Sequence, residues 1–154
     1  MTTNEQEKEE YMSYSIKEVA DMMGVTTSTL RYYDKEGLLP DVERKNGIRV
    51  FEDKDFKWLR VLNCLKNTNM AIKKIKEYVD LAQKGDSTLN ERYQLIKEQK
   101  ANILAQIEQL NYYLKEIEYK EWYYETAIER GTEKEVESVS SPKATLDIDQ
   151  IPKK

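Results

Sequence analysis

The sequence predicts a mainly α-helical chain, in which a small domain of short helices and one hairpin is followed by a single long helix. Three observations support this fold class. Residues 14–51 hold two short helical patterns and then a hairpin signal. Residues 52–84 hold two further amphipathic patterns. Residues 89–130 carry an apolar repeat of seven residues that no proline or glycine interrupts.

The first two predicted helices form a helix-turn-helix. Gly24 ends the first helix, and Thr26 is a suitable N-cap for the second, which covers about residues 27–36. Leu30 is the strong core anchor of the second helix. Helical spacing identifies the apolar face of the first helix as Ile16, Val19, Ala20 and Met23.

A hairpin signal follows the second helix. Residues 42–44 and 48–51 flank Lys45-Asn46-Gly47, and Asn-Gly suits the positive φ angles of a tight turn. A helix-turn-helix with a hairpin that carries basic side chains is typical of a winged DNA-binding module. The sequence therefore predicts a winged helix-turn-helix domain.

Charge and composition agree with this interpretation. The 154-residue chain has a formal net charge of -4, but residues 14–84 carry 14 Lys and Arg against 11 Asp and Glu. The cationic part of the chain is thus the part with the winged pattern. A single Cys and no His argue against a disulfide or a closed zinc site, so we expect no metal or cofactor and a reducing, cytoplasmic location. We find no signal peptide and no apolar run that would span a membrane.

Composition also predicts the domain organisation. We expect an acidic, disordered segment at residues 1–13, the DNA-binding domain at 14–84, a dimerisation helix at 85–130 and a polar, disordered tail at 131–154.

Two helices complete the predicted domain. The third begins after Glu52 or Asp53, runs to about Asn67 and is followed by a fourth that ends near Lys84. The core face of the third consists of Phe56, Leu59, Leu62 and Leu65. The apolar residues of the fourth are Ile72, Ile75, Val79 and Leu81.

The long helix carries an apolar seam made of two heptad positions, one that recurs every seven residues from Leu89 and one from Tyr93. This seam needs a partner to cover it. Thr88 and Glu91 give a capping-box pattern at its start. Packing against the chain's own small domain is the alternative, but that domain is too short to cover the whole helix. Lys100 and Glu121 lie in the seam and favour an antiparallel coiled-coil dimer, in which each would face the opposite charge. The expected dimerisation residues are Leu89, Ile96, Ile103, Ile107, Leu110, Leu114 and Ile117.

The end of this helix is unusually aromatic. The residues are Tyr112, Tyr113, Tyr119, Trp122, Tyr123 and Tyr124. They would pack against the partner's third and fourth helices, or form an aromatic cage for an apolar or cationic ligand.

Four short runs within residues 14–51 match a known family: Ser15-Ile16-Lys17-Glu18-Val19-Ala20, Thr29-Leu30-Arg31-Tyr32-Tyr33-Asp34, Gly37-Leu38-Leu39-Pro40 and Asn46-Gly47-Ile48-Arg49-Val50-Phe51. Through these runs the segment resembles the amino-terminal domain of the MerR family of bacterial transcription regulators. The family usually has tyrosines where this chain has Ile48 and Phe51. With the following helices, the resemblance covers about residues 14–130.

The resemblance implies how DNA would be bound. The start of the second helix would enter the major groove, with one hydroxyl used for capping and one tyrosine half buried. The hairpin would contact phosphates. The third and fourth helices lie where family members form a second wing, which would bring Lys66, Lys73 and Lys74 near the DNA backbone; the alternative is that these lysines are ordinary solvated charges. The expected contacts are Thr27, Ser28, Thr29, Arg31, Tyr32, Tyr33, Arg44, Lys45, Arg49 and Lys73. The implied partners are a pseudo-palindromic operator in double-stranded promoter DNA, a second copy of the chain, and RNA polymerase.

Cys64 is the candidate sensor. Arg60 lies one helical turn before it and Lys57 two turns before it, and such cations would favour a thiolate. This neighbourhood resembles a subgroup of the family that answers aldehyde and electrophile stress through one cysteine. A small buried hydrophobe is the alternative role. A ligand- or drug-responsive regulator that uses the aromatic end is the alternative function.

Two other classes of protein fit less well. An enzyme would need a positioned acid–base or nucleophilic group, and the sequence has no His, no Gly-rich phosphate loop and no nucleophile motif. A coiled-coil scaffold would account for residues 89–130 but not for residues 14–51.

Overall fold

A computed structural model describes residues 13–139 of the chain. The chain divides into two compact units, Met1–Gln99 and Lys100–Lys154, which we call the N-terminal and the C-terminal unit. Helix α5 belongs to both. Among the described residues, no helix combines the length and the apolar character that a bilayer span requires.

The N-terminal unit begins with the helix-turn-helix. Helix α1 (Ile16–Met23) opens with a capping box, in which Ser15 accepts from the Glu18 amide and Glu18 accepts from the Ser15 amide. Gly24 ends α1 in the left-handed conformation, with φ 66°. Helix α2 (Thr27–Lys35) follows after a short turn. Both helices form where their apolar spacing and caps predict them.

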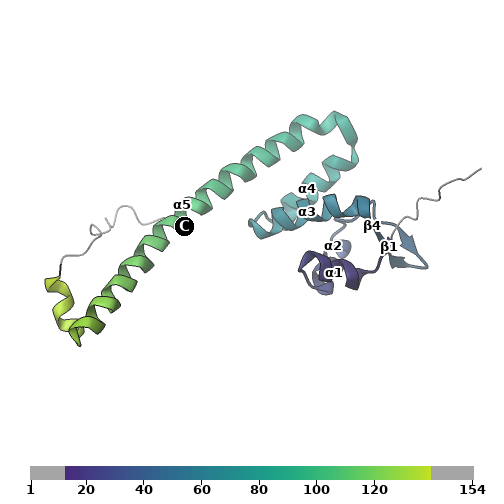
Figure 1. The fold of residues 1–154 in the computed structure, drawn as a ribbon. Helices are drawn as coiled ribbons and strands as arrows, with labels where there is room; N and C mark the ends of the chain where they lie inside the picture. The colour runs from purple at the N-terminus through teal and green to yellow at the C-terminus, as the bar shows by residue number, and fades with distance from the viewer. Residues whose placement is uncertain (1–12, 140–154) are drawn as a thin grey trace, which may run out of the picture. The chain divides into compact units, whose positions relative to one another are not determined.

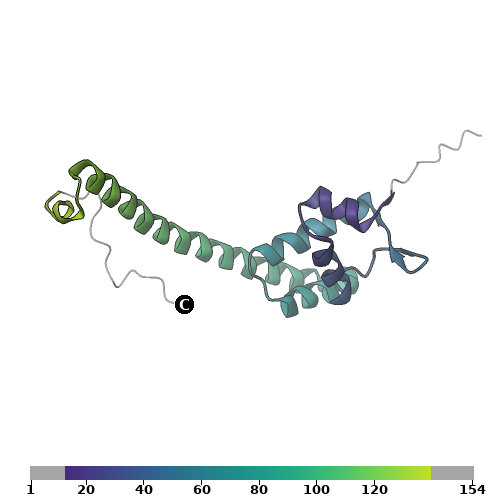
Figure 2. The same ribbon diagram turned by 90° about the horizontal axis from the view of Figure 1, so that it is seen from below.

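Two small antiparallel sheets lie next to these helices. Strands β2 (Arg44–Lys45) and β3 (Ile48–Arg49) form the wing hairpin, with Asn46 and Gly47 at positive φ in its turn. The hairpin projects from the helices of the same unit (Figure 2). Strand β1 (Ser13–Tyr14) pairs with β4 (Phe51–Glu52), as Figure 1 shows. Ser13 was expected in the disordered N-terminal segment, and residues 1–12 lie outside the described residues.

Helices α3 (Asp53–Asn67) and α4 (Ile72–Gln83) complete the core of this unit. Leu59, Leu62 and Leu65 of α3 are buried as predicted, and so are Ile75 and Val79 of α4. They form one hydrophobic cluster with residues of α1, α2, the segment before the wing and strand β4: Val19, Ala20, Leu30, Tyr33, Leu38, Leu39, Val42 and Phe51.

The long helix starts at the predicted residue, but the contacts of Thr88 differ from the predicted capping box. A 3-10 turn, η1 (Gly85–Thr88), precedes α5 (Leu89–Arg130), which runs for 42 residues. Thr88 does not act as half of a capping box. Its hydroxyl donates to the carbonyl oxygens of Leu81 and Gly85 and accepts from Arg92. These bonds tie the start of α5 to the end of α4.

The C-terminal unit contains the rest of α5 and a short 3-10 helix, η2 (Glu133–Ser138). Gly131 turns the chain at φ 73°. The Tyr123 hydroxyl donates to Glu133, and Val136 is buried, so η2 packs against the end of α5. The start of the tail is therefore structured, which the polar composition did not predict; residues 140–154 lie outside the described part of the chain. The predicted fold class, a winged helix-turn-helix followed by a long helix, is confirmed.

Candidate nucleic-acid interface

The first turn of α2 presents two hydroxyls that no residue of the described range 13–139 binds. Thr26 is the N-cap, and its hydroxyl accepts from the Thr29 amide at 3.1 Å. The Thr29 hydroxyl is paired with that of Thr26 at 3.0 Å, so capping occupies one of the three expected hydroxyls. Thr27 and Ser28 have no side-chain partner within the part of the chain that the structure describes, and Ser28 is exposed. These two can offer donors and acceptors to base edges.

The middle of α2 divides its side chains between solvent and core. Arg31 and Tyr32 are exposed, Tyr32 to 40%. Tyr33 is 1% exposed, and burial raises the pKa of its phenol. Its hydroxyl has no hydrogen-bond partner among the described residues. We expected one tyrosine to be half buried; Tyr33 is fully buried, so the expectation that it contacts DNA is corrected.

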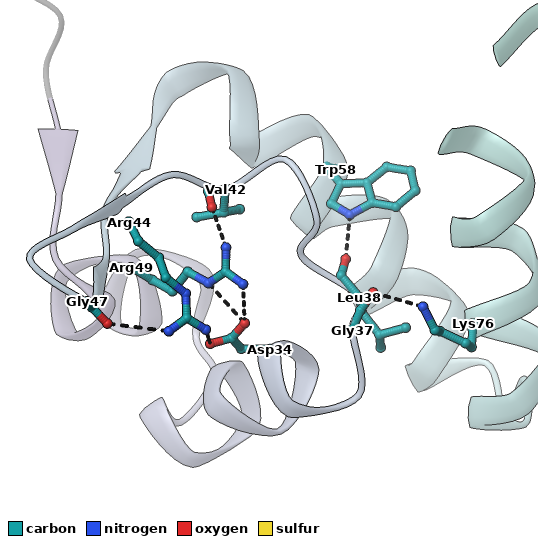
Figure 3. A network of polar contacts seen from close by, with 9 residues as sticks. All are labelled: Asp34, Gly37, Leu38, Val42, Arg44, Gly47, Arg49, Trp58 and Lys76. Atoms are coloured by element: carbon teal, nitrogen blue, oxygen red, sulfur yellow. Dashed lines mark hydrogen bonds and ion pairs between the residues drawn. The ribbon is translucent and has the colours of Figure 1, made fainter. Parts of the chain in front are cut away.

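The wing is joined to α2 by one carboxylate (Figure 3). Asp34, near the end of α2, forms ion pairs with Arg44 of β2 at 3.2 Å and with Arg49 of β3 at 2.6 Å. Arg49 also donates from Nε to Asp34 and from Nη1 to the Val42 carbonyl. Its side chain is 20% exposed, against 52% for Arg44. The two arginines that we expected on phosphates are thus engaged within the protein, and Lys45 between them is exposed.

The elbow between α2 and the wing, Gly37–Leu39, is held from two other helices. Trp58 of α3 donates its indole N–H to the Leu38 carbonyl at 2.8 Å, and Lys76 of α4 donates to the Gly37 carbonyl at 3.4 Å (Figure 3). A side chain at Gly37 would need φ +74° and would meet the Lys76 ammonium at 3.0 Å. The positive φ therefore favours glycine at the elbow.

The three lysines of α3 and α4 that were expected near DNA, Lys66, Lys73 and Lys74, differ in their contacts within the chain. Lys74 is paired with Glu98 at 2.9 Å. Lys66 lies over the Tyr33 ring, 5.5 Å from its centroid. Lys73 is exposed and has no ion pair among the residues that the structure describes. Of the three, Lys73 is the one whose charge is available to a phosphate.

Cys64 is a free thiol on the exposed side of α3. The alternative role of a buried hydrophobe is therefore not supported. Its carbonyl oxygen accepts from the Thr68 hydroxyl at 2.7 Å, and the Thr68 hydroxyl in turn accepts from Gln99 of α5, also at 2.7 Å. Gln99 donates as well to the Thr68 carbonyl and is only 4% exposed. Gln99 thus connects the end of α3 to the long helix.

The seam of α5 is uncovered. The exposed fractions range from 40% at Ile96 to 67% at Leu110 and Ile117. A soluble helix rarely leaves such a stripe in water. Six of the seven expected dimerisation residues are exposed: Leu89, Ile96, Ile107, Leu110, Leu114 and Ile117, whereas Ile103 is half-buried.

The aromatic end of α5 already holds a cation of the chain itself. The Lys120 ammonium lies 4.5 Å from the Tyr123 ring centroid and 5.8 Å from that of Tyr124. A cationic ligand on these faces would have to displace Lys120. The described residues also contain no group of three or more His, Cys, Asp or Glu side chains that could bind a metal ion.

Sequence reasoning did not identify three of the side chains that organise this interface. Asp34 was part of a recognised motif but had no assigned role, and neither Trp58 nor Gln99 was assigned a contact. Their partners lie 10 to 31 residues away in the chain. No pattern within one helix could have revealed them.

Comparison with known proteins identifies the same segment. Residues 14–82 match the family model of the MerR HTH family regulatory proteins. An uncharacterised HTH-type transcriptional regulator of Haemophilus influenzae is 42% identical over 135 residues, which is 87% of this chain and 100% of the relative. The HTH-type transcriptional regulator AdhR of Bacillus subtilis is 35% identical over 58% of this chain and 65% of its own length.

A solved structure extends the similarity to the fold. The crystal structure of HiNmlR, a MerR family regulator lacking the sensor domain and bound to promoter DNA, superposes with a TM-score of 0.75. It is 43% identical and covers 83% of this chain and 100% of its own chain.

Proposed function

Because the chain belongs to the MerR family of helix-turn-helix transcription regulators, we propose that it acts as a homodimer that binds promoter DNA sequence-specifically. Members of this family regulate transcription and are not enzymes. One observation carries the proposal. Helix α2 buries Leu30 and Tyr33 and turns Ser28, Arg31 and Tyr32 to solvent, beside a wing that carries basic residues.

We assign the DNA contacts to side chains whose donors, acceptors or charges are not already paired with other described residues. Thr27 and Ser28 would read base edges, and Arg31 and Tyr32 would contact bases or backbone. Lys45 on the wing and Lys73 on α4 would contact phosphates. Thr29 contributes to the helix cap and is a less suitable contact. We assign this function to residues 14–84 and dimerisation to residues 85–130.

The uncovered seam of α5 supports the dimer. Two chains that pair their long helices in antiparallel orientation would cover it and bring Lys100 near Glu121 of the second chain. A two-fold dimer recognises a pseudo-palindromic operator. By resemblance to the family, the dimer would bend and untwist an over-long promoter spacer so that RNA polymerase engages both promoter elements.

A gel-shift titration tests DNA binding. The full chain is titrated against a duplex that covers its own promoter region and against a random duplex of equal length. We expect preference for the promoter duplex by about a thousandfold or more at physiological salt. Equal affinity for the two duplexes would refute the proposed function.

For the signal, we propose that Cys64 reacts with an aldehyde or another electrophile. The exposed thiol gives access, and the bonds from the Cys64 carbonyl through Thr68 to Gln99 give a path to the long helix. The aromatic end of α5 has less support as a ligand site, since Lys120 covers two of its rings.

A reporter strain dosed with formaldehyde tests the sensor. Cys64→Ser and Cys64→Ala should both lose induction while the purified variants keep the wild-type affinity for promoter DNA. Intact mass spectrometry of the treated wild type should show an adduct that both variants lack. Full induction in either variant would remove Cys64 from the mechanism and leave the DNA-binding proposal untouched.

A further inference from the structure

Asp34, Arg44 and Arg49 form a cluster, which we call the Asp34 clamp, that the DNA contacts proposed above do not use. One carboxylate of α2 pairs with one arginine from each strand of the wing. Oδ1 accepts from Arg49 Nε at 2.9 Å, and Oδ2 accepts from Arg44 Nη2 at 3.2 Å. Both oxygens of the carboxylate are therefore occupied.

Each member of the clamp is unfavourably placed when considered alone. Arg44 and Arg49 are directly opposite in the β2–β3 register, and like charges at such positions repel each other. Asp34 lies in the last turn of α2, where the helix dipole disfavours a negative charge. The three placements become favourable only together, because the carboxylate lies between the two arginines and neutralises part of their charge.

Little else fixes the wing. Each of its strands has two residues, and residues 43–48 are all exposed, whereas an isolated two-stranded hairpin is at best marginally stable in water. Arg49 adds one more anchor by donating to the carbonyl of buried Val42. The clamp therefore sets the position of the wing relative to α2 within the N-terminal unit.

We propose that Asp34 is a specificity-determining residue, an inference that rests on the proposed sequence-specific DNA binding. Phosphate contacts add affinity at any sequence, whereas base contacts discriminate between sequences. With the clamp closed, the Arg49 guanidinium is engaged by Asp34 and the Val42 carbonyl, and the half-exposed Arg44 is held to Asp34 through Nη2. The wing then meets the DNA backbone in one register with α2. Without the carboxylate, two mobile arginines would bind phosphates at any site.

Asp34→Asn in the full chain tests this, since it removes the charge and keeps the side-chain shape. Affinity is measured for the promoter duplex and for the random duplex at several salt concentrations. We expect the variant to bind random DNA about tenfold more tightly, with a salt slope steeper by about one to two, and its preference for the promoter duplex to fall at least tenfold. A purely structural role for Asp34 would instead weaken binding to both duplexes.

Two further variants complete the test. Asp86→Asn removes the same charge from an exposed position of the same unit and should leave the preference unchanged. Arg49→Lys keeps the charge but cannot make the two-pronged contact with Asp34, so its preference should also fall; it decides the question if Asp34→Asn does not fold. An unchanged preference in folded Asp34→Asn or in Arg49→Lys overturns the inference. A wild type without any preference would instead refute the proposed function.

Discussion

The two units of this chain use similar apolar residues to different ends. In the N-terminal unit, Leu30, Phe51 and Leu59 are at most 1% exposed. In the C-terminal unit, Leu110 and Ile117 are 67% exposed. The first unit buries its own core among five elements, α1, α2, β4, α3 and α4. The part of α5 in the second unit leaves its apolar seam exposed, and in the proposed dimer a second copy of that helix would cover it.

The largest effect is expected where the comparison is most direct. In the Leu110→Glu/Leu114→Glu double variant, burial of two charges in the seam would cost more than the dimer gains. We expect this variant to sediment as a monomer at micromolar concentration. Circular dichroism should show that its N-terminal unit is still folded. Ala101→Glu/Ala105→Glu adds the same charge at exposed positions outside the seam and should remain a dimer. If Leu110→Glu/Leu114→Glu were also a dimer, the assignment of the seam as the dimer interface would be wrong.

Single leucines sharpen the same contrast. Leu59→Ala should lower the free energy of unfolding by about 2–5 kcal/mol, because it leaves a cavity in a closed core. It should leave the dimer dissociation constant unchanged. Leu110→Ala should raise that constant about a hundredfold or more, since each dimer loses two buried side chains worth about 1.5 kcal/mol or more each. Sedimentation at several concentrations and urea denaturation separate the two effects, and equal shifts in both variants would erase the distinction between the units.

Gln99 lies at the boundary between the two units, and its loss should have an intermediate effect. Gln99→Ala leaves the Thr68 carbonyl and hydroxyl without their 3.0 and 2.7 Å partners from α5. We expect a loss of about 1–3 kcal/mol in the free energy of unfolding, measured by urea denaturation. Gln94→Ala, at an exposed position of the same helix, should stay within about 0.5 kcal/mol of wild type. Similar losses in the two variants would show that the Gln99 contacts do not matter.

Asp55 gives the smallest effect and a pH dependence. Burial raises the pKa of this carboxyl, which accepts from the Glu52 amide at 2.9 Å. The folded chain therefore binds the proton more readily than the unfolded chain, and this contribution to stability declines as the pH rises from the ordinary carboxyl pKa through the raised value. Asp55→Asn should remove that decline, whereas Asp55→Ala should cost about 1 kcal/mol. Urea titrations between about pH 3.5 and 7 should show the difference; parallel curves for wild type and Asp55→Asn would contradict it.

Local signals predicted much of the fold, and long-range contacts explain the rest. The Gly24 stop, the Leu30 anchor and the uninterrupted stretch to Arg130 depend on spacing within one element, and all three were predicted. Which of Tyr32 and Tyr33 faces the core depends on neighbouring helices, and the sequence left this open.

The same reason explains what the sequence did not reveal elsewhere. Arg49 was expected at a phosphate because a basic hairpin residue is usually solvated, and its carboxylate partner, 15 residues earlier, was not foreseen. Thr88 looked like half of a capping box, but its hydroxyl is used by the Leu81 carbonyl, seven residues before it. Burial of Val136 likewise follows from the turn at Gly131 and not from the polar composition around it.

The bond from Trp58 to the Leu38 carbonyl has a mechanical consequence. Trp58 and Cys64 lie on the same helix, less than two turns apart. If modification of the thiol rotated α3, the hydrogen bond from the Trp58 indole would pull on the Leu38 carbonyl and so on the elbow, unless that bond broke. Trp58→Phe would keep an aromatic ring but remove this hydrogen bond. The thiol could then react without moving the elbow or α2.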